Sequence, residues 1–429
     1  MSSTETPVME GSLDDRLSRI FASEPVAMAH PDETWRELRD RAPVHRLGPI
    51  VLVARHEDAR DVLRDQQRFS SRYFVTGSRA QAIRASLGPE QLAANDEIGA
   101  FESMYMSRSD DEQHDRLRGI ANRVFTPRRM ADKRSAIQGY TDEMLDVMRE
   151  EEVTDVVSRL AYRLPLMVIA DMLGVPPSER DQIHRWSGQL GRNRGGDDPE
   201  ALMVAHRAML EFRHYVEDIL VPLRQHREGS DLLTALLEAE ESSRLSPVEL
   251  TAMFVVLLFA GHETTTNLIS IGLLETLRHR DQWQRLTADP GLAPQAVEEL
   301  LRWVSPVQFQ WRATRTDVEV QGVRIESGTT VAAVLAAANR DPEVFAAADQ
   351  LDFTRPDAKQ HLALGLGPHF CLGNALARLE GTVVYETLAR RFPDLELAED
   401  DPPFQGNAMM RNPARVPIRL GAERRSPSS

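Results

Sequence analysis

A long apolar segment, residues 246–280, constrains the fold more than any other stretch of the chain. It begins with Ser246, Pro247 and Glu249, a pattern in which the serine and glutamate cap backbone N–H groups and the proline occupies the first turn. The pattern predicts one helix that runs to about Arg280 and has an apolar middle. A helix of this length and composition is typically buried, so we expect the other elements to pack around it.

The middle of this helix contains AGHETTT, a poor helix interior because three β-branched threonines follow one another beside a glycine. Ala260, Gly261 and Thr264 fall on one face, where the small pair leaves space and the hydroxyl can bond to a carbonyl one turn earlier, bending the helix. Such broken local rules are expected at functional sites. Thr264 and the neighbouring acid Glu263 could hold a small ligand such as dioxygen and deliver protons to it. Alternatively, the threonines merely pack.

The stretch HLALGLGPHFCLGNALAR contains Cys371, the only cysteine among 429 residues. A single cysteine excludes an intramolecular disulfide and a zinc site with several thiolates. Gly365 and Gly367 precede it and permit a tight turn close to a bulky group, and Gly373 follows it at the start of a helical pattern. Cys371 therefore lies where a loop enters a helix, a position whose dipole favours thiolate over thiol.

Three roles for Cys371 follow from its chemistry. It is a buried structural residue, a nucleophile with His369 as its base, or a thiolate ligand to haem iron. The residues around it do not by themselves decide between these roles.

The sequence GLGPHFCLG with its following helix resembles the haem-binding loop of the cytochrome P450 superfamily, and residues 260–264 match that family's oxygen-activation motif Ala-Gly-x-[Asp/Glu]-Thr. The resemblance implies that Cys371 is the axial ligand of haem b, with Gly365 and Gly373 in its loop. It implies that Ala260 and Gly261 border the cofactor and that Glu263 and Thr264 relay protons to dioxygen. Relatives typically have phenylalanine where this chain has Leu364, so the packing beside the thiolate differs.

Two further motifs take their meaning from the resemblance. The sequence HDRLR matches the family's His-x-x-x-Arg, which implies that His114 and Arg118 bind the haem propionates, together with Arg312 and His369. An isolated Glu-x-x-Arg pair is ordinarily a helix salt bridge worth a few tenths of a kcal/mol. Here the resemblance implies a structural group made by Glu299, Arg302 and Arg355.

The charge of the chain is uneven. A formal net charge of −15 argues against binding to nucleic acid or to an anionic membrane. Residues 113–134 nevertheless contain seven arginines and lysines against only Asp115 and Asp132. This stretch is either a solvated face or a docking patch for an acidic partner. The resemblance implies that a ferredoxin or flavodoxin docks on residues 116–134 and that NAD(P)H is used only indirectly, through such partners.

The amino terminus lacks the basic start and apolar run of a signal peptide. The longest apolar run, residues 252–261, is about half as long as a bilayer-spanning helix needs to be. We therefore expect a cytoplasmic protein without a membrane anchor, and a monomer. We expect a partly ordered segment over residues 1–30, one domain over 31–421 and a polar tail over 422–429.

The expected fold is mainly α with small antiparallel β-sheets, and the resemblance implies the single triangular domain of the cytochrome P450 family. Strands are expected over residues 43–55 around a Gly48-Pro49 turn, and over residues 312–334 with turns at Gly322 and Gly328. A C-terminal strand pair with residues 407–411 at its tip completes the strands. Helices are expected over residues 56–66, 136–150, 156–172, 179–190, 199–226, 231–240 and from Cys371 to about Arg391. Residues 70–113 lack a clear pattern and are expected to form a long binding loop.

The expected reaction is insertion of one oxygen atom into an apolar small molecule by hydroxylation or epoxidation, in natural-product tailoring. Candidate substrate contacts are Met104, Met106, Val307, Phe309 and Met409, and Gln308 and Gln310 could add hydrogen bonds. A non-enzymatic haem carrier or sensor would not explain the proton relay. A thiol hydrolase or transferase using Cys371 and His369 would leave the other motifs without a role.

Overall fold

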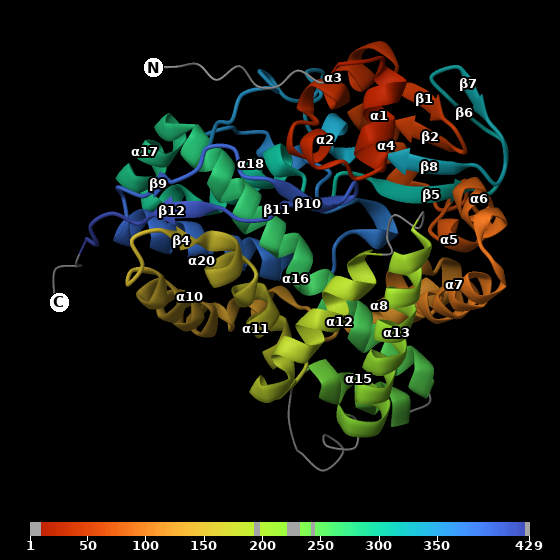
Figure 1. Cartoon of the computed structure of the whole chain (residues 1–429), viewed down its shortest axis with the longest axis horizontal. Helices are drawn as coiled ribbons and strands as arrows, with labels where there is room; N and C mark the ends of the chain where they lie inside the picture. The colour runs from red at the N-terminus through yellow and green to blue at the C-terminus, as the bar shows by residue number, and fades with distance from the viewer. Residues whose placement is uncertain (1–9, 193–197, 221–231, 242–244, 425–429) are drawn as a thin grey trace.

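The computed structural model describes residues 10–192, 198–220, 232–241 and 245–424. In Figure 1 the molecule has a roughly triangular outline, with most strands gathered on one side together with α1 to α4, and α12, α13 and α15 at the opposite corner. The α-helices are α1 (Leu13–Phe21), α2 (Pro25–Ala29), α3 (Asp32–Arg41), α4 (His56–Arg64), α5 (Tyr73–Thr76), α6 (Ser78–Ser86), α7 (Pro89–Glu102), α8 (Asp111–Ala121), α9 (Pro127–Ala131), α10 (Arg134–Met148), α11 (Arg163–Met172), α12 (Arg180–Arg192), α13 (Pro199–His214), α15 (Leu232–Glu241), α16 (Pro247–Arg278), α17 (Arg280–Ala288), α18 (Ala293–Val304), α19 (Leu335–Ala338) and α20 (Asn374–Arg391).

The remaining elements are short. Single turns of 3-10 or π helix are η1 (Met106–Arg108), η2 (Val157–Ala161), η3 (Pro177–Glu179), η4 (Tyr215–Leu220), η5 (Pro290–Leu292), η6 (Ala358–Gln360) and η7 (Gly367–His369). The strands are β1 (Val44–Leu47), β2 (Ile50–Val53), β3 (Phe69–Ser70), β4 (Thr154–Asp155), β5 (Gln310–Thr314), β6 (Val318–Val320), β7 (Val323–Ile325), β8 (Thr330–Ala333), β9 (Glu396–Leu397), β10 (Phe404–Asn407), β11 (Met410–Pro413) and β12 (Pro417–Arg419).

Helix α16 runs through the middle of the molecule (Figure 1). Its capping box forms as predicted, with the Ser246 hydroxyl accepting from the Glu249 N–H and the Glu249 carboxyl accepting from the Ser246 N–H. The helix is long and apolar enough to cross a membrane, but 78% of its most apolar window is buried inside the fold. Burial in the core of the protein therefore accounts for the apolar composition of this helix.

Two hydrophobic clusters meet along α16. Its first half, residues 250–258, packs with α7, α12 and α13, while residues 268–277 pack with α10, α18 and α20. The segment between them is AGHET, the part of the helix that carries small and polar side chains. The break in apolar character thus coincides with a gap between the two clusters, and the helix stays continuous across it.

The largest sheet has the order β1-β2-β8-β5-β3. The β1–β2 hairpin turns at Gly48 and Pro49 as predicted, and β5 pairs with β8 in antiparallel register. The pairing of β2 with β8 is parallel and joins the two predicted β regions into one sheet. Along β5, successive side chains alternate between faces. Gln310 and Arg312 point into the cavity described below, whereas Trp311 packs in another cluster.

Several predicted elements differ from the structure. Residues 70–113 form α5, α6, α7 and η1 and not a long irregular loop. Residues 407–411 belong to a separate hairpin, β10–β11, while the C-terminal strand β12 pairs with β9 and β4. The predicted helix 199–226 is seen as α13 and η4 up to residue 220, and its last part lies outside the described residues.

Candidate active site

A cavity lies where the middle of α16 faces the loop that carries Cys371. Its walls come from elements far apart in the sequence: α8, α11, α16, β5 and the start of α20. The residues that line it are mostly apolar and include Met106, Arg118, Phe125, Ile169, Val256, Leu257, Ala260, Gly261, Thr264, Thr265, Val307, Gln310, Arg312, Leu364, Gly365, His369, Cys371, Gly373 and Glu380. The fold therefore brings the cysteine loop and the AGHET segment to one site.

The loop before Cys371 has a backbone that requires glycine. Gly365 and Gly367 have φ angles of +70° and +72°, and a Cβ on Gly367 would lie 3.1 Å from the Cα of Arg64. The N–H of Cys371 donates to the carbonyl of Leu364 at 2.8 Å, which closes the loop beneath the cavity. The two glycines thus allow the chain to fold back tightly and present the thiol to the cavity.

The thiol of Cys371 is buried, and this burial raises its pKa above the ordinary value. The N–H of Gly373 and the cations of Arg118 and Arg378 act in the opposite direction but do not outweigh burial. The position before a helix, which favours thiolate, is therefore not sufficient to lower the pKa in the protein alone. A cation bound in the cavity would add the missing stabilisation of the thiolate.

Four predicted anchor residues surround the same cavity. Arg118, Arg312 and His369 line it, and the ring of His114 lies with its centroid 4.3 Å from that of His369. Nε2 of His114 and Nε of Arg312 are buried and have no hydrogen-bond partner in the part of the chain that the structure describes. Buried polar groups without partners cost free energy. A carboxylate-bearing ligand such as haem would supply the acceptor that Nε of Arg312 lacks. Nε2 of His114, whose Nδ1 faces Oδ1 of Asp115 at 3.1 Å, is the second unpaired nitrogen beside the cavity, so these residues fit haem.

His369 lines the cavity beside Cys371. Burial, with the nearby charges of Arg312, His114 and Arg118, lowers the pKa of His369 to about 2. Its Nε2 is 2.8 Å from the hydroxyl of Ser71. The role of His369 toward a ligand with carboxylates stays a prediction.

Arg312 is buried on β5. Burial lowers the pKa of its guanidinium to about 10, although Tyr73 and Asp110 favour the charged form. Within the described residues its guanidinium makes one hydrogen bond, from Nη1 to the carbonyl of Trp311 at 2.8 Å. At neutral pH Arg312 is thus a cation that lacks a carboxylate partner in this part of the chain.

The predicted relay residues occupy different places. Thr264 lines the cavity, and its Oγ1 donates to the carbonyl of Ala260 at 3.1 Å. The carboxyl of Glu263 lies against α12, since a Cβ on Gly191 would be 3.2 Å from its Oε1. Gly261 permits close packing of α11, because a Cβ there would lie 3.0 Å from Ile169. The hydroxyl thus faces the cavity and the acid faces the helix that covers it.

The structural group around Glu299 is completely buried. Arg302 donates to both carboxyl oxygens of Glu299 at 2.8 and 2.7 Å, and Nε of Arg355 donates to Oε1 at 3.0 Å. The guanidinium of Arg302 also donates to the carbonyls of Asn339, Ala348 and Gln350. This group ties α18 to the chain between residues 339 and 355.

Sequence reasoning missed Glu380, which lines the cavity from α20 and is 1% exposed. Burial raises the pKa of Glu380 to about 8, and the hydroxyl of Thr265 on α16 acts in the opposite direction without outweighing it. Its sequence signal is a single acid on the apolar face of the helix after Cys371. At neutral pH the group is mostly a protonated carboxylic acid.

The predicted substrate contacts divide into two groups. Met106, Val307 and Gln310 line the cavity, whereas Met104, Phe309 and Met409 do not. Phe309 is 1% exposed and packs between Phe21 and Trp311, with ring centroids 5.2 and 4.9 Å away. Its placement in the pocket was wrong because its side chain faces the cluster of α1 and β5. Gln308 is also structural, because its Nε2 donates to the carbonyls of Val304 and Ser305.

The other two displaced contacts lie close to the covering helices. Met104 packs in the cluster of α7, α12 and α13. Met409 lines a smaller second cavity together with Tyr73, Phe74, Arg79, Ile98, Arg108, Leu190 and Trp311. That cavity is bounded by α5, α6 and α7, so the helical segment 73–102 covers this part of the molecule.

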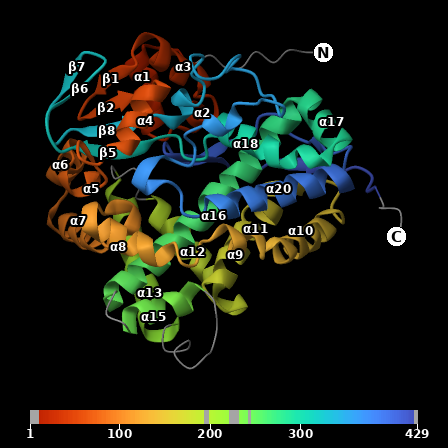
Figure 2. The same ribbon diagram turned by 180° about the vertical axis from the view of Figure 1, so that it is seen from behind.

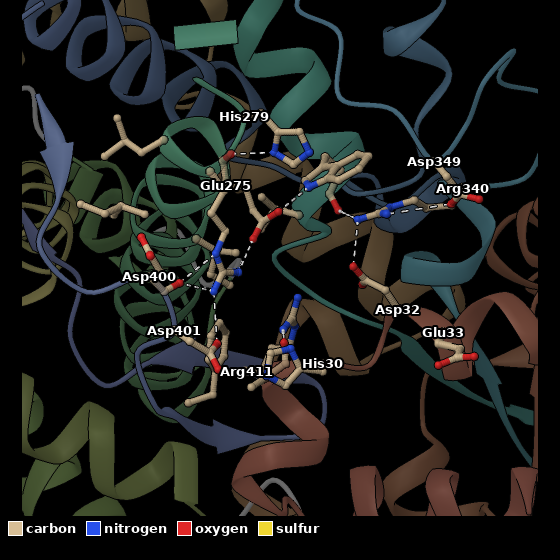
Figure 3. A pocket seen from close by; sticks show the side chains of 18 of the residues that line it. His30, Asp32, Glu33, Glu275, His279, Arg340, Asp349, Asp400, Asp401 and Arg411 are labelled. Atoms are coloured by element: carbon tan, nitrogen blue, oxygen red, sulfur yellow. Dashed lines mark hydrogen bonds and ion pairs between the residues drawn. The ribbon is translucent and has the colours of Figure 1, made fainter. Parts of the chain in front are cut away.

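A larger cleft of about 1270 Å³ lies between α3, the end of α16 and the C-terminal strands (Figure 3). Its charged side chains contact one another: Arg278 donates to Glu275 and to the backbone of Asp400, and His30 lies 3.4 Å from Asp401. Arg340 stacks on the ring of Trp303 at 3.5 Å. These contacts join distant chain segments, whereas the cavity at Cys371 presents unpaired donors.

Comparisons with known proteins agree with this geometry. The family model described as Cytochrome P450 matches residues 200–289 and 291–417. Among curated proteins, the chain is 38% identical to Cytochrome P450 107B1 of Saccharopolyspora erythraea over 89% of this chain and 93% of that protein. It is 35% identical to 6-deoxyerythronolide B hydroxylase of the same organism, over 90% of this chain and 95% of that protein.

Solved structures show the same likeness. A ligand-free structure of CYP164A2 from Mycobacterium smegmatis has a TM-score of 0.83 at 30% identity and covers 95% of this chain and 100% of that one. The bacillaene polyketide synthase cytochrome PksS from Bacillus subtilis has a TM-score of 0.80 at 31% identity, covering 92% and 97%.

Proposed function

Because the chain belongs to the cytochrome P450 family, we propose that it is a monooxygenase that inserts one atom of dioxygen into an apolar small molecule by hydroxylation or epoxidation. The observation that carries the proposal is the one cavity that is lined by Cys371, Thr264 and Arg312, whose buried Nε lacks an acceptor within the described residues. A haem carrier or sensor would need the cysteine and the donors but not a hydroxyl on the opposite wall.

Haem b, when bound, would supply the activation of dioxygen and the oxidation of the substrate. Cys371 would ligate its iron through the thiolate, with Gly365 and Gly373 allowing the close approach of the loop. Arg118, Arg312 and Nε2 of His114 would bind its carboxylates, and neutral His369 would add a hydrogen bond. Ala260 and Gly261 would border it on the opposite side.

Protons would reach the oxygen side through the chain's own residues. The Thr264 hydroxyl bonds to the carbonyl of Ala260, so it is fixed on the cavity wall with its lone pairs available. Glu263, on the side toward α12, would bring protons from the protein surface to that hydroxyl. The apolar walls would exclude bulk water, which limits proton leakage away from the reaction.

The substrate class follows from the walls and from the relatives. Val307, Met106 and the apolar residues of α16 line the cavity, which suits a mainly hydrocarbon ligand. Relatives bear the names 6-deoxyerythronolide B hydroxylase, Vitamin D(3) 25-hydroxylase and Steroid C26-monooxygenase. We propose a medium to large natural product of polyketide or terpenoid type.

Electrons would come singly from a ferredoxin or flavodoxin, and NAD(P)H would be used only by the reductase of that partner. We place the docking patch on residues 116–134, where Arg123, Arg128 and Arg129 are exposed. We also propose that the protein acts as a monomer in the cytoplasm.

The proposal is tested by spectroscopy of the purified chain. The reduced, carbon monoxide-bound protein is expected to show the red-shifted Soret band of thiolate-ligated haem, and Cys371→Ser is expected to lose that band. A colourless wild-type protein would overturn the proposal. Apolar compounds that displace iron-bound water would identify the substrate through their difference spectra.

A second measurement separates the monooxygenase from a haem carrier. Thr264→Ala is expected to keep the thiolate-type band but to release peroxide, with product per electron falling about tenfold or more because positioned proton transfer is lost. Unchanged coupling of electrons to product would argue against the relay. Thr266→Ala is the matched control, because Thr266 is a buried threonine of the same helix that does not line the cavity, and its hydroxyl likewise donates to a carbonyl one turn earlier, that of His262.

A further inference from the structure

A second buried carboxylate stands next to the Glu299 group on α18. Glu298 is 5% exposed and contacts residues on both sides of Cys371 in the sequence, His361 before it and Arg378 after it. The contacts of Glu299 run instead to Arg302, Arg355 and the N–H of Asp352. Two adjacent acids on one helix therefore hold two different segments of the chain.

On the C-terminal side, a chain of hydrogen bonds connects Glu298 to the cysteine itself. Arg378 donates from Nε to Oε1 of Glu298 at 2.6 Å and from Nη2 to Oε2 at 3.2 Å. Its remaining nitrogen, Nη1, donates to Oδ1 of Asn374 at 2.9 Å. The amide of Asn374 then donates to the carbonyl of Cys371, also at 2.9 Å. The forked guanidinium thus transmits the position of α18 to the backbone of the cysteine.

On the N-terminal side, His361 fixes the start of the loop. Its Nδ1 accepts from the N–H of Ala363 at 3.2 Å, so Nε2 carries the proton and donates to Oε2 of Glu298 at 3.2 Å. The N–H of Leu362 donates to Oδ1 of Asn339 at 2.6 Å. The carbonyl of Leu364 then accepts from the N–H of Cys371. Both ends of the glycine loop are therefore fixed to the same helix.

The charge of Glu298 suits this position. Burial by itself would raise the pKa of Glu298, but hydrogen bonds from His361 and Arg378 lower it to about 2. Oε1 of Glu298 accepts from Arg378, and Oε2 accepts from both Arg378 and His361. Both carboxyl oxygens are therefore paired. A satisfied buried network of this kind specifies one arrangement of the groups that it joins.

We propose that Glu298, acting through Arg378, Asn374 and His361, is a positioning residue that fixes the Cys371 loop for iron ligation. This inference rests on the proposed function, in which Cys371 ligates haem iron, and assigns to Glu298 a role separate from that of Glu299. Partners that orient a metal ligand typically change metal affinity 10–100-fold when they are substituted.

The test uses Glu298→Gln, which keeps the volume but puts an amide N–H₂ where two donors point. Glu275→Gln is the matched control, because Glu275 on α16 accepts from Nε1 of Trp303 on α18, the helix that carries Glu298, and its hydrogen bonds within the described residues do not reach the cysteine loop. Haem loss to excess haem-free globin is expected to be about tenfold faster in Glu298→Gln than in wild type. The carbon monoxide-bound form is expected to convert to the short-wavelength, thiol-type band at a similarly raised rate.

Cys371 itself provides a readout that does not depend on haem. Since it is the only cysteine, its labelling by a maleimide in the haem-free full chain reports the mobility of the loop. Labelling is expected to be about tenfold faster in Glu298→Gln, in line with the outer-shell effect above, and unchanged in Glu275→Gln. Asn374→Ala, which removes only the last contact to Cys371, is expected to reproduce the effect with little change in the unfolding midpoint. Arg378→Lys is expected to rescue part of the loss seen in Arg378→Gln.

Two results would overturn the inference. One is a Glu298→Gln protein whose labelling rate and thiolate-type band equal those of wild type while only its unfolding midpoint falls, as expected of a merely structural ion pair. The other is an Asn374→Ala protein with a wild-type labelling rate. If the wild-type chain binds no haem, the proposed function fails, whereas the labelling comparison still decides whether Glu298 fixes the loop.

Discussion

At the scale of single residues, the carboxyl of Glu380 titrates far from its ordinary range. It is buried on α20, and this burial raises its pKa to about 8 against the opposing effect of the Thr265 hydroxyl. The unfolded chain would release the same proton near pH 4.5. Between these two pKa values the folded state holds a proton that the unfolded state has lost, so rising pH favours unfolding.

Glu380→Gln should remove this pH dependence, because glutamine keeps the shape and stays neutral. The stability that the protonated acid retains is fully present below pH 4.5 and is lost as the pH rises toward about 8. Relative to the variant, the wild-type free energy of unfolding should fall by about 1.4 kcal/mol for each pH unit in that window. Urea unfolding of both haem-free chains at several pH values measures the difference, and parallel curves would contradict a buried neutral acid.

The site residues that belong to a recognisable motif could be predicted from the sequence. Cys371, Thr264, Arg118 and Arg312 line one cavity, as the motifs implied. The acids missed by the prediction, Glu298 and Glu380, have no spacing that distinguishes them from surface acids, because only the packing of α18 against α20 buries them. The side chain of Phe309 was misplaced for a similar reason, since the sequence does not show whether it points toward the cavity or toward α1.

At the scale of secondary structure, the helices with a clear apolar period were predicted well and residues 70–113 were not. Helix α7 packs against both α13 and α16, so its apolar residues do not form a single stripe that a periodic pattern would reveal. Its start did carry a signal, Gly88 followed by Pro89 at the first helical position. The parallel β2–β8 pairing could not be predicted, because its strands are far apart in the sequence.

The Glu299 group should behave as a structural element and not as part of the reaction. Glu299→Gln leaves the guanidinium groups of Arg302 and Arg355 buried without their full counter-charge, which typically costs about 3–5 kcal/mol. We expect a loss of this size in urea unfolding, with the thiolate-type band intact in the fraction that folds. Glu326→Gln, at an exposed pair with Arg46, is the control and should leave the free energy of unfolding nearly unchanged. A Glu299→Gln protein as stable as this control would contradict the structural role.

At the scale of the whole molecule, a basic surface interrupts an acidic protein. The net charge is −15, yet Arg123, Arg128 and Arg129 are exposed around the start of α9, and none of them forms an ion pair within the described residues. Helix α9 packs against α20, the helix that follows Cys371, and α8, α9 and α20 are seen together in Figure 2. A partner bound on this surface would therefore lie on the cysteine side of the cavity.

Charge reversal at this surface should slow electron delivery without altering the site. Opposite fields raise association rates about 10–10³-fold, so the double variant Arg128→Glu with Arg129→Glu should reduce the second-order rate of reduction by a reduced ferredoxin at least about tenfold at low ionic strength. The difference should shrink as salt is added, because at about 1 M the screening length falls to about 3 Å.

Stopped-flow reduction over a range of salt concentrations measures this rate, and reduction by a photoreduced flavin should be the same in variant and wild type. The double reversal Arg415→Glu with Arg419→Glu, at two exposed positions near β12, changes the net charge by the same amount and is the control. An equal loss of rate in that control, or a loss that does not depend on salt, would show that the patch on residues 116–134 does not dock the partner. Attraction confined to this patch would explain how a chain with a net charge of −15 recruits another acidic protein.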